Sequence, residues 1–210
     1  MTRIALIDHG AGNLVSAARG LERSGAIVTV VNSADSLDDS AGLEAPDGVV
    51  LPGVGTTGAA MARLHEQGLV DALAKWSKPL LGICVGLQLF FDRSQEDDTE
   101  CLGFIGGEVA RLTDAPLLPH IGWNDVALSN DPLFAGLGSS ELFYFVHSFA
   151  PVPHDKSEVI GWAEYSSPFA AAVRRGNRVG VQFHPERSGA AGLSVLANFV
   201  ANCREARRAA

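Results

Sequence analysis

One stretch of the sequence decides the fold, and it reads Pro79-Leu80-Leu81-Gly82-Ile83-Cys84-Val85-Gly86-Leu87-Gln88-Leu89-Phe90-Phe91. The apolar residues before the cysteine predict a buried strand, and those after it predict the start of a helix. Gly82 and Gly86 permit the strained backbone and the close helix–strand packing that a sharp turn between the two requires. We therefore expect the thiol of Cys84 to stand at the end of a strand, in front of the first N–H groups of a helix.

The same alternation of strand and helix occurs on the N-terminal side of this stretch. Apolar runs at 3–7, 26–31 and 48–51 predict strands, and helices are expected over 14–24 and 57–76. Successive βα units place parallel strands side by side with their helices packed against the sheet. The pattern therefore predicts an α/β fold with a doubly wound, mostly parallel central sheet and helices on both faces.

The C-terminal half has a different pattern of predicted secondary structure. Turn signals such as Asn130-Asp131-Pro132 separate shorter strand-like runs at 102–112, 125–128, 142–149, 158–165, 169–174 and 178–183. These runs predict additional strands, which we expect to be antiparallel. A last helix carries Leu193, Leu196, Val200 and Cys203 on one face. No internal repeat or linker is visible, so we expect one domain over residues 1–210.

Composition and charge exclude several classes of protein. The chain is 47% hydrophobic and 19% charged, which suits a globular domain with a large core. Its formal net charge of −8 argues against nucleic acid as the main ligand. No apolar run approaches the roughly 18 residues that cross a bilayer, and no signal peptide is recognised, so we expect no membrane association and a cytoplasmic location. The three cysteines, at 84, 101 and 203, lie too far apart for a disulfide framework or a zinc site.

The chemistry is expected at Cys84 and at a second segment, Gln182-Phe183-His184-Pro185-Glu186. Helix N-terminal N–H groups favour a thiolate, and a histidine backed by a carboxylate is a suitable base. We expect the second segment to lie at the end of a strand, where the two-residue spacing puts His184 and Glu186 on one face. The carboxylate then holds the tautomer of the imidazole and supports its charged form. Together these residues predict a Cys-His-Glu hydrolase. The alternative is a buried apolar cysteine, a core histidine and a surface charge.

Other motifs are less specific. The loop Pro52-Gly53-Val54-Gly55 is either a plain turn or a source of peptide N–H groups for an oxyanion hole. Gly10-Ala11-Gly12 lacks the third glycine of a dinucleotide-binding turn. The histidines other than His184 show no metal-ligand spacing. Trp123, between a glycine and an asparagine in an expected loop, is either a core ring or a contact residue.

These motifs together resemble those of the class I glutamine amidotransferases. Within that class, the chain is most similar to the glutaminase subunits of imidazole glycerol phosphate synthase. The matching segments are spread over the whole chain, and they are Asp8-His9-Gly10-Ala11-Gly12-Asn13-Leu14, Leu51-Pro52-Gly53-Val54-Gly55, Gly82-Ile83-Cys84-Val85-Gly86-Leu87-Gln88-Leu89, Pro119-His120-Ile121-Gly122-Trp123-Asn124, Tyr144-Phe145-Val146-His147-Ser148-Phe149 and Gln182-Phe183-His184-Pro185-Glu186-Arg187-Ser188-Gly189.

The resemblance implies a flavodoxin-like fold and the hydrolysis of L-glutamine to glutamate and ammonia, with no metal or organic cofactor. It also implies a heterodimer with a (β/α)₈-barrel cyclase, which would use the ammonia to make imidazole glycerol phosphate and an aminoimidazole carboxamide ribotide in histidine biosynthesis.

The resemblance also implies a role for each matching residue. Cys84 would be the nucleophile, His184 the acid and base, and Glu186 the carboxylate that orients it. The oxyanion hole would be formed by the backbone N–H groups of Val54 and Val85. The residues that match those holding glutamine are Gly53, Gly55, Gln88, Glu96, Ser148 and Phe149. The residues that match the face toward the cyclase are Trp123 and Arg187.

The sequence departs from the family pattern at a few positions. Thr56 and Thr57 stand where an aromatic residue is frequent, and His9 and Phe149 stand where tyrosine is common. These departures affect the expected details of loop gating and docking and leave the triad intact. Three other functions stay open: a glutaminase for another synthase such as that of pyridoxal phosphate, a non-catalytic assembly subunit of the same fold, and a cysteine peptidase.

Overall fold

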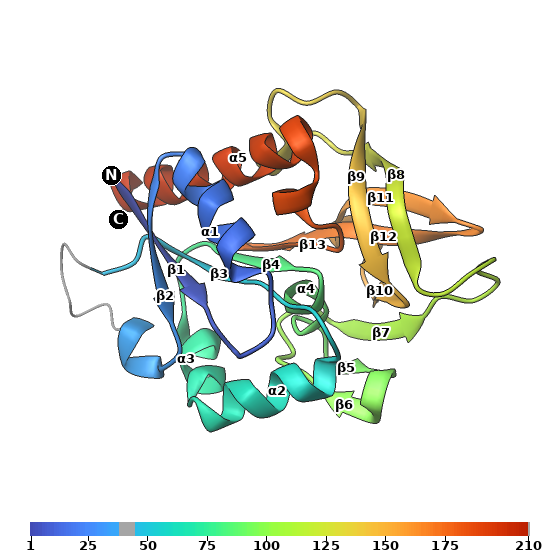
Figure 1. Cartoon of the computed structure of the whole chain (residues 1–210), viewed down its shortest axis with the longest axis horizontal. Helices are drawn as coiled ribbons and strands as arrows, with labels where there is room; N and C mark the ends of the chain where they lie inside the picture. The colour runs from blue at the N-terminus through green and yellow to red at the C-terminus, as the bar shows by residue number, and fades with distance from the viewer. Residues whose placement is uncertain (38–44, 210) are drawn as a thin grey trace.

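The fold is built around a central sheet that runs through the whole molecule (Figure 1). A computed structural model describes residues 1–37 and 45–209. Within those ranges, nine strands follow the order β2-β1-β3-β4-β13-β12-β11-β8-β9. The first five are parallel to one another, and they are β1 (Thr2–Ile7), β2 (Ala26–Val31), β3 (Gly48–Leu51), β4 (Leu80–Ile83) and β13 (Arg178–Val181).

The remaining strands of the sheet are antiparallel, as expected. They are β12 (Ser167–Arg175), β11 (Val159–Tyr165), β8 (His120–Leu128) and β9 (Ser140–His147). The expectation was wrong for the run at 178–183, because it forms β13, which pairs with β4 in parallel. A smaller sheet of order β10-β7-β5-β6 lies beside them, formed by β5 (Arg93–Ser94), β6 (Thr99–Glu100), β7 (Gly107–Arg111) and β10 (Phe149–Pro153). The predicted α/β class and mostly parallel central sheet are therefore confirmed.

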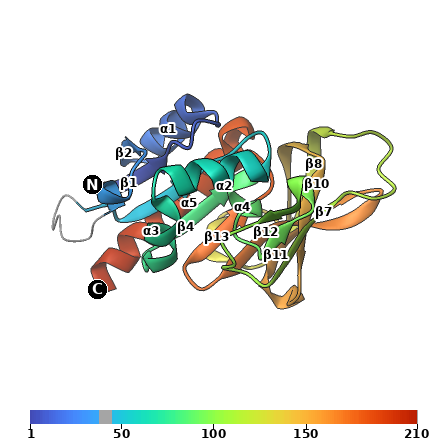
Figure 2. The same ribbon diagram turned by 90° about the horizontal axis from the view of Figure 1, so that it is seen from below.

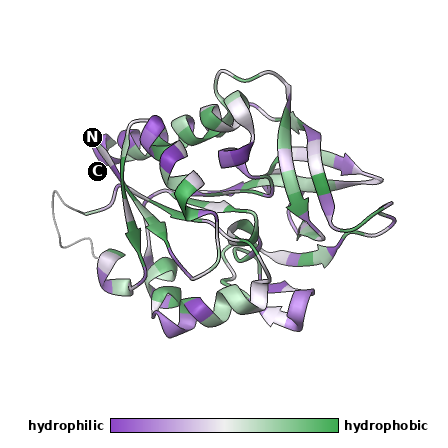
Figure 3. Cartoon of the chain, in the orientation of Figure 1, coloured by the Kyte–Doolittle hydropathy of each residue, from purple (hydrophilic) through white to green (hydrophobic). Residues whose placement is uncertain are grey.

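Helices cover both faces of the parallel strands. Figures 1 and 2 show α1 (Leu14–Arg23) and α5 (Gly189–Ala209) on one face, and α2 (Thr57–Glu66) and α3 (Leu69–Lys75) on the other. The strands between the helix layers are mostly apolar, whereas the helices carry both polar and apolar residues (Figure 3). The short α4 (Val85–Gln88) follows β4. Short 3₁₀ helices occur at Ala34–Leu37, Glu96–Asp98, Pro132–Phe134, Lys156–Glu158 and Pro185–Arg187.

Several expected boundaries were wrong. The single helix predicted over 57–76 is two helices, because Gly68 takes a left-handed conformation with φ +67° and breaks the helix after Gln67. The run at 102–112 forms a strand only over Gly107–Arg111. The run at 125–128 is the end of a longer strand that starts at His120, so Trp123 lies in β8 and not in a loop. Strand β10 was not predicted separately from the run at 142–149.

None of the helices in the described ranges is long and apolar enough to cross a membrane.

Candidate active site

Cys84 occupies a strained turn between β4 and α4. Its backbone has φ +54° and ψ −110°, a conformation that is unfavourable for a residue with a side chain. The turn is held in place because the N–H of Cys84 donates to the carbonyl of Val181 on the neighbouring β13, at 2.8 Å. A Cβ atom on Gly86 would lie 1.8 Å from the carbonyl oxygen of Leu51, so only glycine fits there. The sharp turn predicted from the sequence is present, although α4 spans only four residues.

His184 and Glu186 contact each other beside this turn. The imidazole Nδ1–H donates to Glu186 Oε1 at 2.9 Å, and the two side chains are only 5% and 4% exposed. The strand-spacing argument for this contact was wrong, because β13 ends at Val181 and Pro185–Arg187 forms a 3₁₀ turn. The turn folds Glu186 back onto the ring. The N–H of His184 donates to the carbonyl of Tyr144, which fixes the segment against β9.

The charge balance at His184 favours the imidazolium. Burial alone lowers the pKa of the ring, but the Cys84 thiol and the Glu186 carboxylate interact with it and raise its pKa to about 10. A proton taken from the cysteine is therefore well accommodated on the histidine. This is the electrostatic arrangement expected of a thiolate–imidazolium pair.

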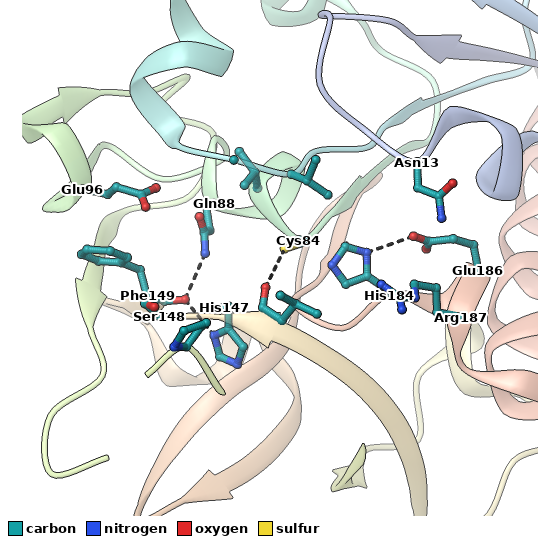
Figure 4. A pocket seen from close by; sticks show the side chains of 15 residues that line it. Asn13, Cys84, Gln88, Glu96, His147, Ser148, Phe149, His184, Glu186 and Arg187 are labelled. Carbon is teal, nitrogen blue, oxygen red and sulfur yellow. Dashed lines mark hydrogen bonds and ion pairs between the residues drawn. The ribbon is translucent and has the colours of Figure 1, made fainter. Parts of the chain in front are cut away.

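These three residues line one cavity of about 260 Å³. Figure 4 shows Cys84 at its centre, His184 and Glu186 on one side, and Gln88 and Glu96 on the other. The remaining lining residues are Asn13, Val54, Gly55, Val85, Pro119, Val146, His147, Ser148, Phe149 and Arg187. Within the described ranges, no group of three or more His, Cys, Asp or Glu side chains has the arrangement of a metal site.

The cavity brings together most of the residues expected to hold a substrate. Gln88, Glu96, Ser148 and Phe149 all line it. The Glu96 carboxylate accepts a hydrogen bond from the N–H of Thr57, at the start of α2, at 3.0 Å. Burial raises the pKa of Glu96, the Thr57 bond opposes that shift, and the charge of Asp97 adds to it.

The glycine loop is held near the cysteine by His9. The Nε2–H of the buried His9 donates to the carbonyl of Pro52 at 2.7 Å, so an imidazole supports this loop. Val54 and Gly55 line the cavity. Gly53 does not: it packs behind Val85, where an added Cβ would lie 2.7 Å from the Val85 Cβ atom.

Trp123 and Arg187 lie on an exposed aromatic surface beside the cavity mouth. Trp123 is 55% exposed, which excludes the core-ring interpretation. Its ring meets Tyr144 edge-on at a centroid distance of 6.0 Å, and the Arg187 guanidinium lies 4.4 Å from the centre of the same Tyr144 ring. Ile121 and Leu142, on the same two strands, are 60% and 50% exposed. A row of large exposed apolar residues next to a cavity is typical of a protein-binding surface.

Sequence reasoning missed several polar residues that line the cavity or lie behind it. Buried Gln182 lies 3.6 Å from the Cys84 sulfur, and buried His147 contacts both His120 and the carbonyl of Phe149. The only available signal for Gln182 was a single glutamine directly after the short strand Arg178-Val179-Gly180-Val181. Asn13 also lines the cavity, and Figure 4 shows its amide pointing toward Glu186.

Comparisons with known proteins agree on one family. The family described as glutamine amidotransferase class-I matches residues 5–203. A protein of Moorella thermoacetica named imidazole glycerol phosphate synthase subunit HisH is 46% identical over 204 residues, which are 95% of this chain and 94% of that protein. The protein of the same name from Xylella fastidiosa is 44% identical over 203 residues, covering 95% and 98% of the two chains.

Solved structures resemble the chain in fold. A putative GMP synthase subunit from Thermoplasma acidophilum superposes with a TM-score of 0.75 at 20% identity, over 100% of this chain and 97% of that one. The structure of PurLQS from Thermotoga maritima gives a TM-score of 0.73 at 21% identity, over 95% of this chain and 98% of the matched chain.

Proposed function

The chain belongs to the class I glutamine amidotransferase family, and from this premise we infer that it is the glutaminase subunit of an imidazole glycerol phosphate synthase in histidine biosynthesis. It is an enzyme that releases ammonia from glutamine. We further propose that Cys84, His184 and Glu186 carry out the hydrolysis. The observation that supports this proposal best is the placement of a strained cysteine and a buried His–Glu pair in one cavity.

The reaction starts with attack of the Cys84 thiolate on the side-chain amide carbon of glutamine. The C–S bond forms and the carbonyl π electrons move to oxygen, which gives a tetrahedral oxyanion. His184 then donates its proton to the departing nitrogen and the C–N bond breaks. Ammonia is released, and the glutamyl group stays bound to Cys84 as a γ-glutamyl thioester. Neutral His184 next takes a proton from water as the water oxygen attacks the thioester carbon. The C–S bond then breaks, which releases glutamate and restores the Cys84 thiolate beside protonated His184. Glu186 keeps the ring in the required tautomer throughout.

The oxyanion requires hydrogen-bond donors, and we place them on the side of the cavity formed by the glycine loop Pro52-Gly53-Val54-Gly55. The N–H groups of Val54 and Val85 are the proposed donors, since both residues line the cavity next to Cys84. Gly55, with φ +91°, allows the loop peptides to turn at little cost. Removing one such donor typically lowers the rate by roughly 10²–10³. Reorientation of this loop when the partner binds would therefore be a strong switch of activity.

The glutamine backbone is proposed to lie at the end of the cavity away from His184. There Glu96 offers a carboxylate for the α-ammonium group, and Gln88, Ser148 and Phe149 offer polar atoms around it (Figure 4). Gly53 supports the loop from behind and is not proposed to touch the substrate.

The partner is proposed to be a (β/α)₈-barrel cyclase that receives the ammonia in the cytoplasm. It would dock on the surface formed by Trp123, Tyr144 and Arg187, because this surface adjoins the cavity mouth and consists of the aromatic and arginine residues that anchor interfaces. Docking there would cover the exit of the cavity and limit the loss of ammonia to water.

Replacement of Cys84 tests the proposed chemistry. Cys84→Ala should abolish glutamate formation in the presence of the cyclase while leaving the melting temperature and cyclase affinity close to those of the parent chain. Cys101→Ala is the matched control, since Cys101 lies outside the cavity and should retain activity. Glutamine turnover by Cys84→Ala at a near-parental rate would refute the proposal. Glutamine-dependent release of ammonia by the parent complex also separates this function from a scaffold or a peptidase.

A further inference from the structure

A buried glutamine side chain contacts the nucleophile from behind. Gln182 follows β13, is completely buried, and its Nε2 atom lies 3.6 Å from Cys84 Sγ. The proposed mechanism assigns it no role. A buried amide has to find partners for its N–H₂ and C=O groups, so its orientation can be worked out from its neighbours.

The carbonyl of Phe149 fixes that orientation. It lies 3.0 Å from Gln88 Nε2, and because a carbonyl can only accept, the Gln88 atom that faces it must be the N–H₂ group. The same Gln88 nitrogen lies 3.1 Å from the Gln182 side chain, which must therefore present its oxygen. The N–H₂ group of Gln182 is then left to face Cys84. If the Gln182 amide were flipped, its N–H₂ group would face the N–H₂ group of Gln88. If the Gln88 amide were flipped, its oxygen would face the carbonyl oxygen of Phe149.

The contacts of Cys84 differ between its two protonation states. As a thiol it donates toward the carbonyl of Val146, at 3.8 Å. As a thiolate it has no proton to donate, and the Val146 carbonyl, which can only accept, cannot form a hydrogen bond with it. The N–H of Gln182 and the protonated ring of His184 then become its hydrogen-bond donors. A donor to the charged form of an ionisable group stabilises that form.

We propose that Gln182 is a further catalytic residue, whose N–H donates to the Cys84 sulfur, favours the thiolate and aims it into the cavity. Because Gln88 holds the other end of the Gln182 amide, the nucleophile and the substrate-binding side of the cavity are joined by one hydrogen-bonded chain. The inference rests on the proposed function for its catalytic meaning, but the hydrogen bond to sulfur can be tested without turnover.

The test is alkylation of Cys84 by iodoacetamide in the full-length chain, followed by peptide mapping that separates Cys84 from the other two cysteines. A hydrogen bond to a charged group contributes about 1.5–3 kcal/mol, which corresponds to roughly a 10- to 100-fold change in an equilibrium. Gln182→Met should therefore slow the alkylation of Cys84 at neutral pH by about 10- to 100-fold. The difference between the parent and variant rates should shrink as the pH is raised, because the hydrogen bond favours the thiolate only while a proton competes for the sulfur.

The titratable groups around the sulfur stay unchanged in this comparison. The ionisable side chains that line the cavity with Cys84 are Glu96, His147, His184, Glu186 and Arg187. Gln95→Met is the matched control, because exposed Gln95 bonds to Glu108 outside the cavity, and it should alkylate like the parent. Gln182→Leu provides a second apolar variant if Gln182→Met does not reach a parental melting temperature.

Two results would overturn the inference. One is alkylation of folded Gln182→Met or Gln182→Leu at the parental rate at neutral pH. The other is a slowing of equal size at neutral and alkaline pH, which would mean that the change blocks access and does not affect ionisation. If the parent complex made no glutamate from glutamine, the proposed function would fail, whereas the alkylation comparison would still report on Gln182.

Discussion

The buried pair formed by His120 and His147 should make the fold sensitive to acid. His147 Nδ1–H donates to the carbonyl of Phe149 at 2.9 Å, and its Nε2 atom lies 3.0 Å from His120 Nδ1. Since Nδ1 of His147 carries the proton, its Nε2 must accept from His120. Protonation of His147 would place two N–H groups against each other and would leave a charge buried between aromatic rings.

The expected size of the effect follows from the pKa of His147. Burial lowers it, the Phe149 bond opposes that shift, and the neighbouring His120 and His184 lower it further, to about 4 from an ordinary value of 6.5. The folded state therefore binds fewer protons than the unfolded state between these two pH values, so stability is lost as the pH falls through this range. A difference of 2.5 pKa units corresponds to about 3 kcal/mol.

The opposite shift of His184 does not obscure this loss. Its pKa is raised to about 10, so its contribution to stability is fully present below pH 6.5 and is lost only as the pH rises through its folded pKa. The acid limb of the stability curve thus reports on the His120–His147 pair, together with carboxylates that titrate at lower pH.

The assay is urea unfolding of the parent chain and of His147→Gln at several pH values. Glutamine keeps a donor and an acceptor but cannot become charged, so the variant should lose about 3 kcal/mol less than the parent between about pH 7.5 and about pH 4. Equal losses in the two chains would refute the reasoning. A parent chain that gained stability over this range would refute it as well.

Three other predictions concern the turn, the triad and the docking surface. Gly86→Ala should lower the free energy of unfolding by roughly 1–3 kcal/mol or more, because its Cβ would collide with the backbone of Leu51; an unchanged urea midpoint would contradict the packing argument. Glu186→Gln should lower kcat by about 10²–10⁴ and lower the pKa of His184, since the carboxylate raises it; an NMR titration that left this pKa unchanged would oppose the assignment. Arg187→Glu should weaken cyclase binding and cyclase-stimulated glutaminase activity at constant melting temperature; unaltered affinity by calorimetry would show that this face does not dock.

The architecture could be predicted because the parallel strands of the N-terminal half are short apolar segments that are recognisable from local sequence. The runs at 3–7, 26–31 and 48–51 lie within one residue of β1, β2 and β3. The break between α2 and α3 was foreseeable from Gly68, since a glycine takes the left-handed conformation that ends helices more readily than any other residue. The C-terminal strands were harder to delimit. Their pairing with distant partners, such as His120 with His147, extends β8 well beyond its apolar segment.

The arrangement around Cys84 was only partly predictable. The strained turn follows from local glycines, so it can be read from a short segment. The His184–Glu186 contact was expected for the wrong reason, because Pro185–Arg187 forms a turn and not the end of a strand. Gln182 could not be assigned from its own neighbourhood, since its orientation depends on Gln88 and on the carbonyl of Phe149, which are 94 and 33 positions away in sequence.

The central claim is that Cys84 attacks glutamine, and covalent trapping tests it most directly. The complex with the cyclase is incubated with an electrophilic diazoketone analogue of glutamine, and the modified residue is located by peptide mapping. We predict modification of Cys84 alone among the three cysteines, loss of glutaminase activity in proportion to the label, and protection by glutamine. Loss of activity with the label on another residue, or with Cys84 still unmodified, would contradict the account.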